Sequence, residues 1–242
     1  MIMIKVPYTV VADITKYEGE VFNPTPDSLY LAQKKAELDL LQSHTGYTEY
    51  DYLPLVKEMS SYCGFQETVD IRKVALQLEE DIAILHEGKV VSMCFCFPSG
   101  FDPKEKVGLT FFELHTPVAD NHKLQRASPK VAELISTPGA LYRRFVWTLT
   151  TSPKLSRHPF YRASEPPVTT IDNLYFRKET QTTVGHADGK TTFFFVKVDV
   201  VPFLSLSDDM QKQAIASLAT MSDAVIEYKG LGDIKKLLYS AS

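Results

Sequence analysis

The sequence predicts an α+β protein in which five antiparallel strands form one sheet with helices on one face. Two hairpins carry this prediction, because apolar runs at 82–85 and 90–97 flank one glycine turn and strands at 174–184 and 191–201 flank another. A further strand is expected at 141–151. Helical patterns precede, separate and follow these strands, and packing them on one face of the sheet is the economical arrangement.

The first third of the chain is expected to be helical. Thr25, Pro26 and Asp27 combine a capping hydroxyl, a proline suited to the first helical position and an acid in the first turn. The leucine and alanine stripe that follows ends near Gly46. A second short helix is predicted over 54–63, before a glycine that stops it.

Helix signals also occur in the middle and at the end of the chain. Ser128 and Pro129 predict a helix start. Ser207 is expected to cap a helix over 208–221, and a last helical piece spans 232–239. The order of strands and helices is also that of a PAS domain, although other α+β folds share it.

Three parts are expected along the chain. Residues 1–70 form an N-terminal helical extension packed on the core, 71–205 form the PAS-like sheet domain, and 206–242 form C-terminal helices. The chain has 242 residues, 44% of them hydrophobic and 23% charged, which is typical of a globular protein and excludes a mainly disordered one. A net charge of −4 gives no overall attraction to nucleic acid or to anionic membranes.

The cysteine content and the hydropathy indicate a cytoplasmic protein. Cys63, Cys94 and Cys96 do not make a disulfide framework, and three cysteines are too few for a four-cysteine cluster. No apolar stretch approaches the length of about 18 residues that a membrane-spanning helix needs. No signal peptide is visible, so we expect no membrane association and a reducing compartment.

Strand 174–184 carries the most informative polar pattern. Side chains alternate between the two faces of a strand, so Arg177, Glu179 and Gln181 share one face. This ladder suits either a solvated face with cross-strand ion pairs or the wall of a cavity, where charge-assisted hydrogen bonds would fix a polar substrate. The sequence alone leaves both interpretations open.

Two further residues have a structural and a functional interpretation. Trp147, the only tryptophan, lies on one face of strand 141–151 and suits either a core anchor or a pocket wall. His115 ends an apolar run and suits either a structural histidine or a haem ligand, with His122 as a competitor. The sequence contains no glycine-rich nucleotide motif, which argues against an enzyme that binds its own nucleotide cofactor.

Several blocks of sequence resemble one family. They are CFPSGFDPKEKVG at 96–108, LHTPV at 114–118, QLEED at 77–81 and RKETQT at 177–182, together with Arg144 and Trp147 in the positions of an R-x-N-W pattern. In this order they resemble the haem-binding alpha subunits of haem-dependent oxidative N-demethylases. The resemblance covers about 77–203.

The resemblance implies a PAS-like domain that binds haem b without a covalent bond, activates O2 and oxidises a small amine. Electrons would come from a separate flavin and iron–sulfur reductase. It implies that His115 is the proximal iron ligand, and we expect Arg144, Trp147 and Lys106 to contact the cofactor.

On the opposite side of the haem, we expect three residues of strand 174–184 to act on the substrate. Arg177 would stabilise bound oxygen or an anionic substrate group, and Glu179 would pair with a substrate ammonium or relay protons. Gln181 would orient one of them.

The leading hypothesis is therefore a haem-dependent, oxygen-activating oxidoreductase, or its catalytic subunit. Two alternatives stay open: a haem-binding gas sensor or carrier without turnover, and a PAS-like interaction module without haem. The last is favoured by Val146, which replaces the asparagine of the family pattern, and by a chain that is short for the family. A homo-oligomer is compatible with each of the three.

Overall fold

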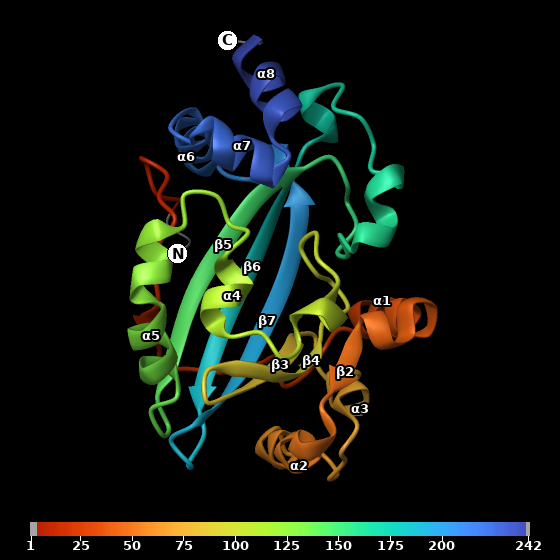
Figure 1. The fold of residues 1–242 in the computed structure, drawn as a ribbon. Coiled ribbons are helices and arrows are strands. Elements are labelled where there is room, and N and C mark those ends of the chain that lie inside the picture. The colour runs from red at the N-terminus through yellow and green to blue at the C-terminus, as the bar shows by residue number, and fades with distance from the viewer. Residues whose placement is uncertain (1–3, 241–242) are drawn as a thin grey trace.

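A computed structural model describes residues 4–240 and places seven antiparallel strands in one sheet, in the order β1-β5-β6-β7-β3-β4-β2 (Figure 1). The predicted α+β class is confirmed. The strands are β1 (Thr15–Lys16), β2 (Gly46–Thr48), β3 (Asp81–His86), β4 (Lys89–Cys94), β5 (Leu141–Thr150), β6 (Tyr175–Gly185) and β7 (Thr191–Pro202). The α-helices are α1 (Ser28–Leu41), α2 (Leu53–Tyr62), α3 (Ile71–Ala75), α4 (Phe111–His115), α5 (His122–Ile135), α6 (Asp208–Ala219), α7 (Asp223–Lys229) and α8 (Gly232–Ser240).

The prediction of a five-stranded sheet is wrong in its strand count. The five predicted strands are present and adjacent, as β5-β6-β7-β3-β4, but β1 and β2 extend the two edges. These additions contain two and three residues. Such short strands show no alternating pattern, and they form here because β1 pairs with β5 and β2 pairs with β4. The N-terminal residues therefore contribute to the sheet as well as to the helices beside it.

Helices pack on both faces of the sheet, which corrects the expectation of one covered face. On one face, Phe193 and Phe195 of β7 meet the ring of Tyr62 from α2. On the same face of β5, Trp147 stacks on Phe176 and joins the apolar core of α6, α7 and α8. The opposite face, which lies under α4 in Figure 1, carries the polar ladder of β6.

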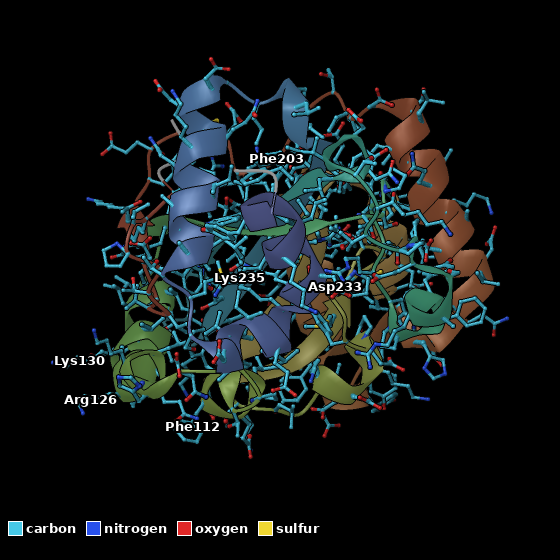
Figure 2. The ribbon with its side chains drawn as sticks, turned by 90° about the horizontal axis from the view of Figure 1, so that it is seen from above. Phe112, Arg126, Lys130, Phe203, Asp233 and Lys235 are labelled. Carbon is cyan, nitrogen blue, oxygen red and sulfur yellow. The ribbon has the colours of Figure 1, made fainter. Side chains whose placement is uncertain are left out.

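Figure 2 shows how the interior and the surface differ around the C-terminal half. Phe203 is fully buried in the core that the C-terminal helices cover, whereas Arg126 and Lys130 point outward from α5. Among residues 4–240, no helix is long and apolar enough to cross a membrane.

Most helix predictions are confirmed, with two shifts of boundary. Helix α1 begins at Ser28 because the Asp27 carboxylate, and not Thr25, accepts the first backbone amides. Helix α5 begins at His122, so the start predicted at Ser128–Pro129 is wrong and Pro129 lies inside the helix. A buried stripe along the helix outweighs the missing amide of the proline there.

Gly185 ends β6 against the backbone of the chain that leaves α5. Its amide donates to the carbonyl oxygen of Ala140 over 3.0 Å, and its carbonyl accepts from Gly139 over 2.8 Å. A Cβ atom here would lie 1.9 Å from the carbonyl oxygen of Thr137. We therefore expect Gly185→Ala to lower the free energy of unfolding by about 1–3 kcal/mol or more, because rigid backbone must move apart.

Urea denaturation measures this loss. Gly232→Ala is the matched control, since no described atom outside the neighbouring residues and the backbone of its own helix lies within 4 Å of a Cβ built at Gly232. Equal unfolding midpoints for the two variants would show that the close approach at Gly185 is absent.

Candidate functional site

The polar ladder of β6 occupies one face, as the alternation predicts. Glu179 pairs across the sheet with Val146, and Gln181 pairs with Arg144, so Arg144 of β5 joins the same face. The Gln181 side-chain amide donates to Glu179 Oε2 over 2.9 Å. Glu179 is 16% exposed, which makes it a shielded carboxylate rather than a solvated one.

Arg177 is fully committed to contacts within the protein. Its guanidinium is 1% exposed and donates to the hydroxyl of Ser99 over 3.0 Å, to the carbonyl of Phe97 over 2.7 Å and to the carbonyl of Leu155. The Ser99 hydroxyl in turn donates to Glu179 Oε1. Arg177 thus ties two loops to β6 and places Ser99 on Glu179.

His115 ends the short helix α4, which begins with a capping box. The Thr110 hydroxyl accepts from the amide of Glu113, and the Glu113 carboxylate accepts from the amide of Thr110. This box fixes the turn that carries His115, whose Nδ1 lies 2.7 Å from the carbonyl oxygen of Phe111. That carbonyl can only accept, so Nδ1 carries the proton and Nε2 keeps a free lone pair. No described residue makes a hydrogen bond to Nε2.

Burial lowers the pKa of His115. The hydrogen bond to Phe111 opposes this shift, and the positive charge of Arg144 adds to it. The neutral imidazole is therefore the favoured form near pH 7.

Arg144 and Lys229 are two cationic side chains with few acidic groups near them. Arg144 has a buried Nε that makes no hydrogen bond to any described residue. Lys229 of α7 donates to the carbonyl oxygen of Trp147 over 3.1 Å, and burial lowers its pKa to about 8. Glu179 is the acidic group that opposes this shift, whereas Arg144 and Arg157 reinforce it.

These side chains form one charged cluster, which we define as His115, Arg144, Glu179, Lys229 and Tyr8. Arg144 interacts electrostatically with the other four members, His115, Glu179, Lys229 and Tyr8. Lys229 Nζ lies 5.7 Å from the centre of the Tyr8 ring. Burial raises the pKa of Tyr8 to about 12, so its hydroxyl stays protonated and able to donate.

The structure brings His115, Arg144, Glu179 and Gln181 together, but it places two other predicted residues elsewhere. The Trp147 side chain lies on the opposite face of β5 and is 8% exposed in the core of the C-terminal helices. Lys106 lies in the 3-10 turn Pro103–Lys106, with its Nζ 5.8 Å from the centre of the Phe101 ring. His122, the competing histidine, is exposed at the start of α5.

Sequence reasoning missed Lys229, Tyr8 and the role of Ser99. A lysine before a glycine at the end of a helix is typical of a surface residue near the helix C-terminus, so no local signal predicts that Lys229 is partly buried. Tyr8 lies outside any regular element. Ser99 belongs to the CFPSGF block that carries the family resemblance, and this block was the sequence feature that could have identified Ser99 as part of the site.

The charge of Arg144 predicts a measurable effect on His115. We expect Arg144→Gln to raise the pKa of His115, because the variant loses a positive charge that opposes protonation. Histidine Cε1–H signals followed by NMR across pH 4–9 report this pKa. Arg143→Gln is the control, since Arg143 lies on the other face of β5 beside Thr182. An unchanged His115 pKa in Arg144→Gln would contradict the arrangement.

Comparison with known proteins identifies the family. No curated protein matches the chain. A family model described as "Haem-dependent oxidative N-demethylase, alpha subunit-like" matches residues 43–239, which is most of the chain and includes every residue of the charged cluster except Tyr8. The chain therefore belongs to the haem-dependent oxidative N-demethylase, alpha subunit-like family.

Proposed function

We propose that this protein is a haem-dependent oxidoreductase that activates O2 to oxidise a small amine, and that His115 would hold the haem iron. The observation that carries the proposal is the state of His115. Its Nδ1–H is held by a backbone carbonyl, its Nε2 is free, and its pKa is lowered. A histidine that binds a metal through one ring nitrogen characteristically donates a hydrogen bond from the N–H of the other, as Nδ1 does here.

The residues around His115 fit a haem in two respects. Among the described residues, no group of three or more His, Cys, Asp or Glu side chains could hold a bare metal ion. Haem iron needs only one histidine from the protein, because the porphyrin supplies four nitrogen ligands. Arg144 and Lys229, both partly buried, offer cationic groups for the two carboxylates of haem b, and the orphaned Nε of Arg144 would gain a partner.

Bound haem supplies the oxygen-activating redox chemistry. The side chains of β6 supply recognition of the amine: Glu179, held by Ser99 and Gln181, presents a carboxylate to a protonated amine. As the amine gives up its proton, Glu179 is placed to accept it. We propose a positioning role for Arg177, whose bonds to the two loops keep Ser99 on Glu179. The oxygen-stabilising role expected for Arg177 stays a prediction.

Electrons are proposed to come from a separate reductase, because the sequence contains no nucleotide-binding motif. We propose haem b bound without a covalent link, as the family resemblance implies; the chain also contains no C-x-x-C-H motif for covalent attachment.

The absorption spectrum tests the proposal directly. Protein produced with ample haem is expected to show a strong Soret band that shifts after dithionite and again after carbon monoxide. Reduced protein is then expected to consume O2 faster when dimethylamine or a similar small amine is added. A spectrum without a Soret band, even after added hemin, would overturn the haem proposal. A Soret band without any amine-dependent O2 consumption would instead favour a sensor or carrier.

A further inference from the structure

A pocket lies between α1 and the loop that follows β5. It has a volume of about 220 Å³. Its apolar wall comes from Ala36, Phe97 and Leu155. The polar lining residues are Gln33, Glu37, Lys154, Ser156 and Tyr161. None of these residues belongs to the charged cluster around His115.

Glu37 provides an unused acceptor in this pocket. Its Oε1 accepts from the Tyr161 hydroxyl over 2.9 Å, but its Oε2 is buried and makes no hydrogen bond to any described residue. A buried carboxylate oxygen without a donor is costly, because it has lost water and gained nothing in return. Burial accordingly raises the pKa of Glu37, although the hydroxyls of Tyr161 and Ser156 and the charge of Lys154 oppose the shift. A ligand with N–H donors would satisfy this oxygen.

Lys154 provides an unused cation on the same pocket. It is exposed, it has no acidic group within salt-bridge distance among the described residues, and its Nζ lies 4.7 Å from the centre of the Tyr161 ring. Tyr161 therefore separates an anionic and a cationic side chain that do not pair with each other. A ligand that carries both charges would complement the two, whereas a simple cation would be repelled by Lys154 and a simple anion by Glu37.

We propose that this pocket binds a small zwitterion of the aliphatic α-amino acid type. The ammonium group donates to Glu37 Oε2, the carboxylate pairs with Lys154, and the short aliphatic side chain packs on the wall of Ala36, Phe97 and Leu155. Recognition rests on α1 and the loop after β5 and does not require haem.

The pocket shares a wall with the candidate functional site. The carbonyl groups of Phe97 and Leu155 accept from Arg177, which ties the same loops to β6. A zwitterion seated here would contact the two residues whose carbonyls accept from Arg177. Occupancy is thus expected to stabilise the loops.

Titration of the full-length chain with L-alanine and its two half-ligands tests the proposal. Ethylammonium retains the ammonium end, and propionate retains the carboxylate end. Followed by isothermal calorimetry or NMR shifts, L-alanine is expected to bind more tightly than either half-ligand. Glu37→Gln is expected to weaken L-alanine binding by roughly tenfold or more, since a charge-assisted hydrogen bond is lost. Lys154→Gln is expected to reduce L-alanine to the affinity of ethylammonium.

Two controls make the outcome specific. Lys35→Gln removes a cation from the outer side of α1, where Lys35 pairs with Asp39, and it is expected to leave the titrations unchanged. His115→Ala alters the proposed haem site and is expected to retain L-alanine binding, so failure of one proposal is distinguishable from failure of the other. Absence of binding, equal affinity for L-alanine and ethylammonium, or indifference to Lys154→Gln would each overturn the zwitterion site.

Discussion

Replacing Lys34 by methionine is expected to lower the free energy of unfolding by about 3–5 kcal/mol, because the change breaks a fully buried ion pair and leaves its partner charged. Lys34 and Asp81 both have completely buried side chains, with Nζ 3.6 Å from Asp81 Oδ1. Methionine has a similar length and fills the space without the charge. The expected loss therefore comes from electrostatics and hydrogen bonding, not from a cavity.

The contacts of Lys34 explain why its loss is expected to lower the free energy of unfolding so strongly. Lys34 Nζ donates to the carbonyl oxygens of Leu78 and Glu80, which lie just before the start of β3. Asp81 accepts from the amides of Cys96 and Phe97, which follow β4. The pair thus joins α1 to the loops at the end of the β3–β4 hairpin. Without Lys34, two buried carbonyl groups lose a donor, and the buried Asp81 carboxylate loses its nearest cation and keeps only its two amide donors.

The loss is also expected to depend on pH. Burial raises the pKa of Asp81, and the charge of Lys34 and the two amide donors oppose the shift. Removing Lys34 raises this pKa further, and a carboxyl whose pKa is raised in the folded state stabilises the fold at low pH and loses that contribution as pH rises. The difference between variant and wild type should therefore be larger at pH 7 than at pH 5.

Urea denaturation at both pH values measures these effects. Lys35→Met is the matched control on the next residue of α1, because Lys35 forms an exposed pair with Asp39 and its loss should cost under about 1 kcal/mol. If Lys34→Met and Lys35→Met unfolded at the same urea concentration, the buried pair would not be a stabilising element of the fold.

Lys34 also illustrates what the sequence could not predict. In a helix, a lysine between two other polar residues is typical of the solvent face, and the burial of Lys34 depends on Asp81, 47 positions later in the chain. The strand faces were predictable, because alternation with period two needs no knowledge of the partner strand. The two edge strands were not, since β1 and β2 exist only through their pairing.

The same distinction applies to the candidate site. The common face of Arg177, Glu179 and Gln181 followed from their spacing, and His115 was singled out by the LHTPV block. Tertiary contacts decide how the two arginines differ. The guanidinium of Arg177 donates to loop carbonyls, whereas the Nε of Arg144 has no partner among the described residues. Lys229 reaches the cluster from α7, 82 positions after Trp147, whose carbonyl it contacts. Long-range packing thus decided which of the predicted polar groups are available.

His115→Ala is expected to abolish axial ligation and weaken haem binding by about 100-fold or more. Loss of a residue that merely orients a metal ligand costs about 10–100-fold in affinity, and loss of the ligand itself should cost at least as much. The Soret band should weaken and shift, and titration with hemin should show the reduced affinity. Because α4 is fixed by its Thr110–Glu113 capping box, the variant is expected to fold.

Two further measurements separate ligation from structure. Added imidazole should restore the wild-type spectrum in His115→Ala, because the free base can enter the space left by the side chain and bind the iron. His122→Ala, which removes an exposed histidine seven positions later, should leave the spectrum unchanged. A His115→Ala protein with the wild-type Soret maximum and hemin affinity would assign the iron to another ligand. The lowered pKa of His115 adds a last expectation: in the haem-free protein its imidazole should stay neutral to a lower pH than an exposed histidine, so protons should compete less with hemin for Nε2.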